Sequence, residues 1–352
     1  MKRILVAALA VFLLFFPLTS HAEGEEYLSE FSSLLPEGIS LADGEDLSES
    51  VGIEAFFTRL FSVLSGERPA LVSLALFSLG LTFLLALSEA LSDTLGDMPK
   101  FGAEAVCACL LFSELSSLLS ETAAGLSEAS SFFRGVIPLL TAVHAAGGNV
   151  SSAAGSALSG ALVFEVLNTL TVQILPPLAG AVLALGLFGS LSPENGVSAP
   201  LSSSVKTVIT RVFGWLTLIF SFALGLQTAV GTAQDTVTLR AAKYAASSAL
   251  PIVGNAVSGA LGSLVSSLAY VRSVIGICGV FVILSLAAPL LVRLLAVRLI
   301  LGFCGGLLSF SGGKSRLFDA FSGAVDVLTA ATAFSSFLMI LETALTVRGT
   351  LG

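Results

Sequence analysis

The amino-acid sequence predicts an all-α membrane protein, a polytopic bundle of roughly eight transmembrane helices (about six to ten) behind an N-terminal signal peptide. The main observation is a shortage of charge, because 55% of the 352 residues are hydrophobic and only 11% are charged. A soluble domain typically has about 25% charged residues, so this chain has too few to cover a water-facing surface. The apolar residues also gather in runs of about 20, the length that crosses a bilayer. The lipid bilayer is therefore the expected surrounding of most of the chain.

Residues 1–22 have the layout of a secretory signal peptide. Lys2 and Arg3 form a positive start, residues 4–18 are apolar, and Ser20-His21-Ala22 offers small residues on both sides of the histidine for cleavage. The apolar stretch is short for a spanning helix, which needs about 20 residues. Cleavage after Ala22 is expected, and an uncleaved signal anchor is the alternative. In both cases the N-terminus of the mature chain is extracytoplasmic.

Residues 23–69 are predicted to form an acidic extracytoplasmic leader. They contain eleven acidic and two basic residues, so this segment accounts for the chain's net charge of −8. Apolar residues recur at helical spacing between Ile53 and Leu64, which predicts an amphipathic helix. It would lie at the membrane surface, against a partner, or on the protein's own outer face. An acidic chain is a poor ligand for phosphate backbones, so nucleic-acid binding is not expected.

Residues 70–352 are expected to form one multi-spanning helical domain. The expected spans cover about residues 70–91, 103–119, 157–175, 178–191, 207–231, 273–292, 294–310 and 324–347. Residues 120–155 are less hydrophobic and are expected to form an interfacial or re-entrant segment, and Pro176-Pro177 is expected to end a span. Basic residues in short loops place both termini outside. Arg293 and Arg298 fit this topology least well, since they would lie near an outer turn and have to snorkel to a headgroup.

Small residues at four-residue spacing are candidates for helix packing. Gly302 and Gly306 form a GxxxG pair, and Ser258, Gly262 and Ser266 form a second ridge. Helices already inside lipid gain little from the hydrophobic effect, so close backbone approach at small residues stabilises their association. Such ridges are common in polytopic proteins and indicate tight packing more than any particular function.

Glu165 is the candidate polar site within the membrane. Asn168 and Thr169 follow it at i+3 and i+4, so the three side chains share one helix face. A carboxylate in a membrane span is costly and often marks ion coupling or a polar contact between helices. The alternative is a hydrogen-bonded packing residue without a further role.

The sequence does not indicate an enzyme, and no catalytic residue, metal site or cofactor is expected. His144 is the only histidine left after cleavage of the signal peptide, which argues against multi-histidine metal sites. Gly312-Gly313-Lys314-Ser315 is similar to the end of a phosphate-binding loop, but that motif requires a glycine where Leu308 stands. The four cysteines have no zinc-type spacing.

One stretch goes beyond a generic membrane protein. Residues 231–254 read GTAQDTVTLRAAKYAASSALPIVG, and SVIGICGVFVILSLAAPLLVRLL follows after a region rich in small residues. These segments resemble the stage III sporulation protein AE family of endospore-forming bacteria. The most specific parts are residues 238–244 and 250–254. The resemblance extends over roughly residues 160–350, and the leader also suits the layout of that family.

The resemblance implies a non-enzymatic, multi-pass subunit of a secretion-like channel complex that joins the mother cell to the forespore. The chain would lie in the mother-cell membrane, with other stage III sporulation proteins, including an ATPase and ring-forming subunits, as partners. The family offers no motif from which functional residues can be assigned here. The alternatives are a stand-alone secondary transporter that uses Glu165 and its neighbours to couple ion movement, and a scaffold that anchors partners through the acidic leader.

Overall fold

The computed structural model describes residues 27–35, 53–95, 98–191, 198–249, 254–310, 312 and 316–348. Nearly all of these residues are helical, and no strand occurs among them, which confirms the predicted all-α class. The expected signal peptide lies outside the described residues.

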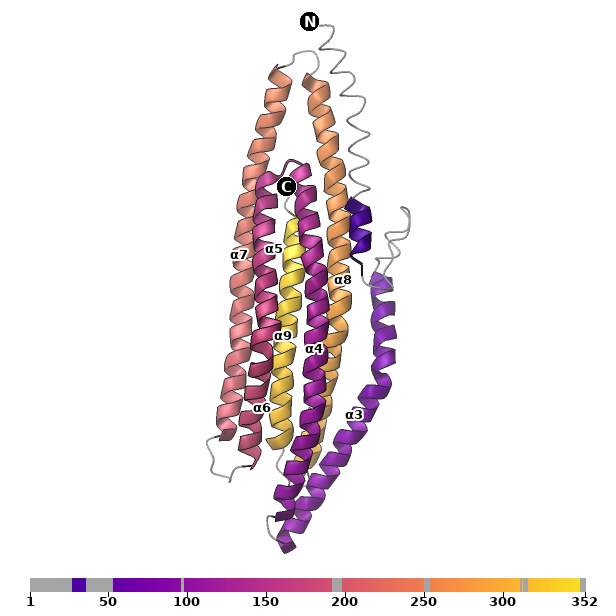
Figure 1. Ribbon diagram of the computed structural model, residues 1–352, viewed down its shortest axis with the longest axis vertical. Helices are drawn as coiled ribbons and strands as arrows, with labels where there is room; N and C mark the ends of the chain where they lie inside the picture. Colours follow the sequence, from indigo (N-terminus) through magenta and orange to yellow (C-terminus); the bar gives the residue numbers. More distant parts are fainter. Residues whose placement is uncertain are drawn as a thin grey trace.

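Long helices that run up and down side by side make up the molecule (Figure 1). They are α3 (Ile53–Leu95), α4 (Met98–Ala146), α5 (Val150–Thr169), the π-helix η1 (Leu170–Ile174), α6 (Leu175–Leu191), α7 (Ser198–Ala249), α8 (Gly254–Phe310) and α9 (Arg316–Arg348). A short helix at residues 27–33 packs on α4, where the rings of Phe31 and Phe132 lie 6.3 Å apart. α3 begins at Ile53, where the sequence predicts an amphipathic helix, so this segment is helical and continues directly into the first expected span.

Six helical segments in the described part of the chain are long and apolar enough to cross a membrane. They are Arg68–Ser92, Met98–Ala146, Val150–Thr169, Ser204–Thr238, Val265–Phe310 and Arg316–Val347, and a shorter apolar segment is Leu175–Phe188. Six lies at the lower end of the range that the sequence predicts. The difference from roughly eight arises mainly because α8 contains two of the expected spans, and because α6 is short.

α4 continues without interruption from Met98 to Ala146, so the expected interfacial segment after residue 120 is part of a long helix. One face of this part is buried and mostly apolar, with Leu126, Phe133 and Leu140 at seven-residue spacing. The opposite face is polar and lowers the average hydropathy of any window along the sequence. Hydropathy averaged along the sequence mixes the two faces, and for this reason the prediction of an interfacial or re-entrant segment was wrong.

The two prolines at 176 and 177 do not end a helix. They lie in the first turn of α6, which continues directly from η1 and α5. A proline ring clashes with the carbonyl four residues earlier in a regular α-helix. Here those carbonyls belong to Val172 and Gln173, which lie in the π-helical turn. The wider turn accommodates the rings and keeps the chain helical.

The prediction of a turn near Arg293 is also wrong, because α8 runs unbroken from Gly254 to Phe310. Both arginines form ion pairs within the bundle. Arg293 pairs with Glu121 of α4, and the Nε of Arg298 lies 2.8 Å from a carboxylate oxygen of Asp326 in α9. These pairs make it possible for a helix with two arginines to remain in the bundle without reaching a headgroup.

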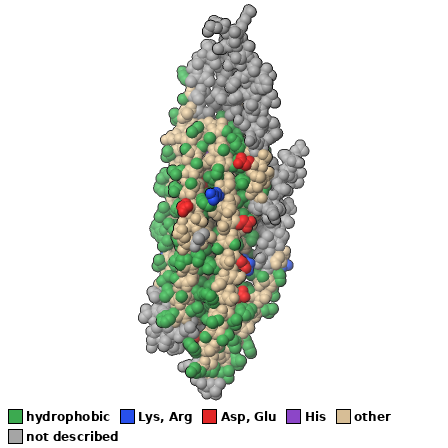
Figure 2. Space-filling model, viewed as in Figure 1, with side chains coloured by type: hydrophobic (Ala, Val, Ile, Leu, Met, Phe, Trp, Pro, Cys, Tyr) green, Lys and Arg blue, Asp and Glu red, His purple; other side chains and the backbone are tan. Residues whose placement is uncertain are grey.

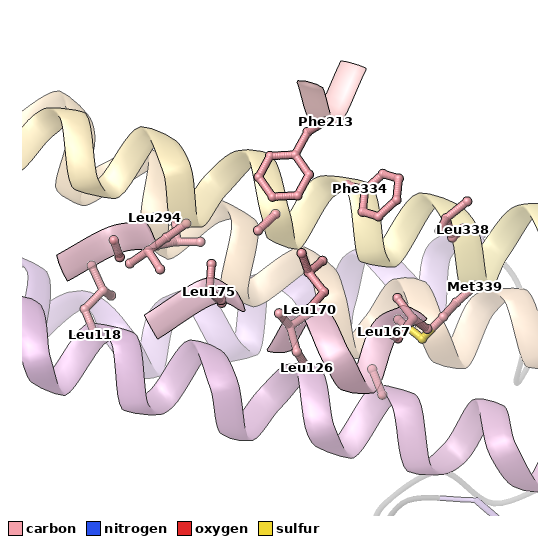
Figure 3. Packing of buried hydrophobic residues seen from close by; sticks show 14 of the residues in the cluster. Leu118, Leu126, Leu167, Leu170, Leu175, Phe213, Leu294, Phe334, Leu338 and Met339 are labelled. Carbon is pink, nitrogen blue, oxygen red and sulfur yellow. The ribbon is translucent and has the colours of Figure 1, made fainter. Parts of the chain in front are cut away.

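α9 lies at the centre of the bundle, where it contacts α4, α5, α6, α7 and α8. Figure 3 shows Phe334, Leu338 and Met339 of α9 among side chains from neighbouring helices. The rings of Phe213 and Phe334 are 5.7 Å apart. Close approach of α8 and α9 depends on Gly276, since a Cβ at that position would collide with Val347.

Candidate functional site

A small polar pocket lies between α4, α5, α7 and α9, in a bundle whose core is otherwise mostly leucine, valine and phenylalanine. The residues that line it are His144, Ser152, Gly155, Ser156, Ser159, Gln227, Thr228, Glu342, Leu345 and Thr346. Its volume is about 20 Å³, which is enough for roughly one water molecule. Four helices therefore bring hydrogen-bonding groups together at one buried place.

Glu342 is the buried acid of this pocket. Its side chain is 3% exposed, and the hydroxyl of Ser159 donates a hydrogen bond of 2.5 Å to its Oε1. A carboxyl group buried between helices is costly unless it is hydrogen-bonded. Ser159 is also 3.1 Å from the carbonyl oxygen of Gly155 in its own helix, so the shorter contact to Glu342 connects α5 with α9.

His144 lies near the end of α4 and is 2% exposed, and neither ring nitrogen has a hydrogen-bond partner in the described protein. Leaving a buried polar group without a partner costs about 1–3 kcal/mol. Either tautomer of a neutral imidazole has one donor and one acceptor. The ring therefore has hydrogen-bonding capacity available for a molecule within the pocket.

Two buried charges of opposite sign act electrostatically on His144. They are Arg272 of α8, which is 2% exposed, and Asp235 of α7. Asp235 also accepts hydrogen bonds of 2.9 and 2.7 Å from the backbone N–H groups of Ser151 and Ser152. These are first-turn donors of α5, where Asn149 makes no side-chain cap. Asp235 thus caps α5 from another helix and holds the pocket serines in place.

Close approach of α5 and α7 completes the pocket wall. Gln227 donates its side-chain N–H to the carbonyl oxygen of Gly155. A Cβ on Gly231 would lie 3.2 Å from the Cα of Ser152, so a larger residue there would push the helices apart. The chemistry available in the pocket is hydrogen bonding and charge, which suits a bound water or a proton more than a covalent reaction.

A second polar cluster ties three helices together lower in the bundle. Asp326 of α9 lies 2.5 Å from the Nζ of Lys206 in α7 and 2.8 Å from the Nε of Arg298 in α8. The three side chains are about a quarter to a third exposed. One carboxylate between two cations balances half of their charge and gives each cation an anionic partner, which lowers the cost of holding the two cations in a membrane bundle.

The structure does not bring the sequence-predicted polar residues into the pocket. Glu165 and Asn168 are exposed on the outer side of α5, and Thr169 is half-buried. The buried carboxyl group is instead that of Glu342. A signal was present in the sequence, because Ser152, Ser156 and Ser159 form a hydroxyl stripe at helical spacing on α5.

The predicted packing glycines also face outward. Gly302 and Gly306 are exposed on α8, and nothing lies within 4 Å of a Cβ built on Gly306. Ser266 is exposed, while the side chains of Ser258 and Gly262 lie outside those that the structure describes. The packing role predicted for these positions stays a prediction, and for the two glycines it would have to involve another molecule.

No group of three or more His, Cys, Asp and Glu side chains in the described part of the chain is placed to hold a metal ion. Cys107, Cys278 and Cys304 are buried free thiols, and Cys109 is an exposed one.

Comparisons with known proteins agree on one family. The family model described as Stage III sporulation protein AE matches residues 29–350. The curated Stage III sporulation protein AE of Bacillus subtilis (strain 168) is 24% identical over 331 residues, which cover 90% of this chain and 82% of that protein. No solved structure matches the chain.

Proposed function

Because the chain belongs to the stage III sporulation protein AE family, we propose that it is a non-enzymatic membrane subunit of a channel complex between the mother cell and the forespore. The complex would resemble secretion machinery and be required for endospore formation. The chain would lie in the mother-cell membrane with its N-terminus extracytoplasmic. Its partners would be other stage III sporulation proteins, including an ATPase and ring-forming subunits.

The observation that supports this proposal most is the combination of family membership with six segments able to cross a membrane. The outer faces of α3, α7 and α8 are rich in large exposed apolar side chains, such as Phe83, Trp215 and Phe303. Lipid is the natural contact of such faces. A bundle of this kind suits a fixed membrane component on which soluble and ring-forming proteins assemble.

The proposal is tested in sporulating cells of the bacterium that encodes the chain. Deletion of the gene should abolish heat-resistant spores, and a tagged copy should restore them. Purification of that tagged copy in mild detergent should recover other stage III sporulation proteins, identified by mass spectrometry. An unrelated multi-pass protein with the same tag is the control. Normal spores after deletion, or recovery of the same proteins with the control, would contradict the proposal.

A stand-alone secondary transporter is the second candidate, and the buried pocket favours it. Glu342 and His144 are titratable, buried and line the same pocket, and Asp235 and Arg272 act electrostatically on His144. Buried titratable groups of this kind can couple ion or proton movement to transport. The test is proton or ion flux in liposomes that contain the purified chain alone. Flux that Glu342→Gln abolishes would support the transporter and contradict the subunit proposal.

A further inference from the structure

One side of α4 is polar over a length comparable to a bilayer. The exposed residues between positions 113 and 134 are Ser113, Glu114, Ser116, Ser117, Ser120, Ala124, Ser127, Glu128, Ser131 and Arg134, with Glu121 half-exposed among them. We call this set the α4 polar stripe. The last large apolar side chain exposed on α4 before it is Phe112. Figure 2 shows acidic side chains in a row along the visible face of the bundle.

The length of the stripe matches the hydrocarbon core. Twenty-one steps of about 1.5 Å each give about 31 Å along the helix, and the hydrocarbon core of a bilayer is about 30 Å thick. Glu114, Glu121 and Glu128 recur every seven residues, so they form one row on the same side of the helix.

The helices on either side of the stripe expose apolar residues at the same heights. At the lower end, Leu71 of α3 lines a pocket with Glu114, and the adjacent Val72 is exposed. In the middle, Arg293 of α8 pairs with Glu121, and the nearby Leu295 is exposed.

At the upper end, the Cζ of Arg134 lies 5.1 Å from the ring centre of Phe164 in α5, and the nearby Leu162 is exposed. The stripe is therefore a polar strip between apolar surfaces and not the beginning of a water-exposed end. The apolar surfaces suit lipid, but a row of carboxylates and hydroxyls does not, because each charged side chain in the hydrocarbon costs several kcal/mol.

The negative charge of the α4 polar stripe limits which kinds of surface can cover it. Glu114 and Glu128 are exposed carboxylates, and only Arg134 at the upper end contributes an exposed positive charge to the stripe. A second copy of the chain presents the same acidic row, and a dry contact between two such rows would bury like charges against each other. Water between the copies removes this penalty.

We propose that the α4 polar stripe lines an aqueous lumen enclosed by several copies of this chain. Copies arranged around an axis would turn Glu114 and Glu128 into two acidic rings, the arrangement by which channels favour cations. The apolar faces of α3, α5 and α8 would then contact lipid or each other. This inference rests on the proposed function to the extent that it supposes a channel, and it adds which face forms the lumen.

Thiol accessibility tests this directly. In a full chain whose four native cysteines are replaced, single cysteines are placed at Ser113, Ser120 and Ser127, and at the control positions Leu162 and Leu295. Serine to cysteine hardly changes the side-chain volume, and detergent size-exclusion profiles confirm folding of every variant. Membranes from sporulating cells are then treated with water-soluble thiol reagents of positive and of negative charge.

In a lumen, the stripe cysteines should react about tenfold faster than the controls, because the reactive thiolate forms in water and not in lipid. The positive reagent should react faster than the negative one, and Glu114→Gln with Glu128→Gln should remove that preference. Two differently tagged copies should purify together. Reaction no faster than at the controls would overturn the proposal.

Two other results would also overturn it. Stripe cysteines that react in the purified chain but are protected in the membranes would indicate a dry contact with a partner. Reactive cysteines in a chain that never purifies with a second copy would mean that another protein closes the wall. Copurification with stage III sporulation proteins is measured separately, so an inert stripe in an assembled complex contradicts the lumen alone and leaves the proposed function intact.

Discussion

The hydroxyl of Ser159 and the carboxylate of Glu342 are joined by a hydrogen bond of 2.5 Å, although the two residues are 183 positions apart in the sequence. The bond links α5 to the central helix α9 at the buried pocket. Glu342 is 3% exposed, so bulk water has little access to this hydrogen bond. The pair therefore constrains how α5 and α9 pack. Its carboxyl group, that of Glu342, is also the most buried acidic group near His144.

Ser159→Ala should destabilise the protein by about 1–3 kcal/mol, because it leaves a buried carboxyl oxygen without its donor. Glu342→Gln should cost less, since the amide oxygen still accepts the hydrogen bond from Ser159. Thermal unfolding of the purified variants in detergent measures both. Ser156→Ala is a matched control, because that hydroxyl bonds only carbonyl oxygens of its own helix. Equal stabilities for Ser159→Ala and Ser156→Ala would contradict the role assigned to the pair.

Asp326 should be more important to stability than either of its cationic partners. Asp326→Asn leaves Lys206 and Arg298 facing each other without a negative charge, whereas loss of one cation leaves a balanced pair. Partly exposed pairs contribute about 0.2–1 kcal/mol each, so Asp326→Asn should cost about 1 kcal/mol or more. The double variant with Lys206→Met should cost less than the sum of the single changes. If the destabilisation of the double variant in thermal unfolding equals the sum for the two single variants, Asp326 and Lys206 do not interact.

The class of the fold could be predicted from the sequence because a shortage of charge and long apolar runs depend on composition alone. The continuity of α8 could not, because Arg293 and Arg298 resemble loop residues until their partners Glu121 and Asp326 are known. These partners lie on other helices. Ion pairs between distant segments leave no local pattern.

The candidate pocket was largely beyond sequence reasoning for the same reason. Glu165 was the more conspicuous acid because it stands in the middle of a predicted span, but helix periodicity does not tell which face turns inward. Glu342 lies on the helix that contacts most of the bundle, and that central position follows only from the packing of all the helices. The serine stripe of α5 can be recognised in the sequence, and it indicates the face of α5 that lines the pocket.

Gly276 and Gly306 should respond differently to substitution, although both lie on α8. Gly276→Ala places a Cβ against Val347 and should cost about 1–3 kcal/mol through overpacking. Gly306→Ala meets nothing within 4 Å and should leave the stability of the purified chain unchanged or slightly raised. Thermal unfolding in detergent measures the difference.

The same comparison tests the GxxxG prediction. If Gly302 and Gly306 pack against another molecule, Gly306→Leu should weaken copurification with the partners while the isolated chain remains as stable as the wild type. A leucine there that changes neither stability nor copurification would remove the packing role predicted for this pair.

Glu165→Gln should leave the free energy of unfolding of the purified chain within about 0.5 kcal/mol of the wild type, because exposed substitutions rarely have larger effects.

In the membrane, the expected effect of changing Glu165 is larger. An exposed carboxylate on α5 is costly in lipid, and a partner that offers a cation or a hydrogen-bond donor would cover it together with Asn168. Copurification of partners and counts of heat-resistant spores should then fall for Glu165→Gln and fall further for Glu165→Leu. Leu162→Ala, exposed on the same helix, is the matched control. Spore counts and copurification that stay at wild-type levels for Glu165→Leu would show that this acid has no role in the assembly, since the most severe change on that face would then have been tolerated.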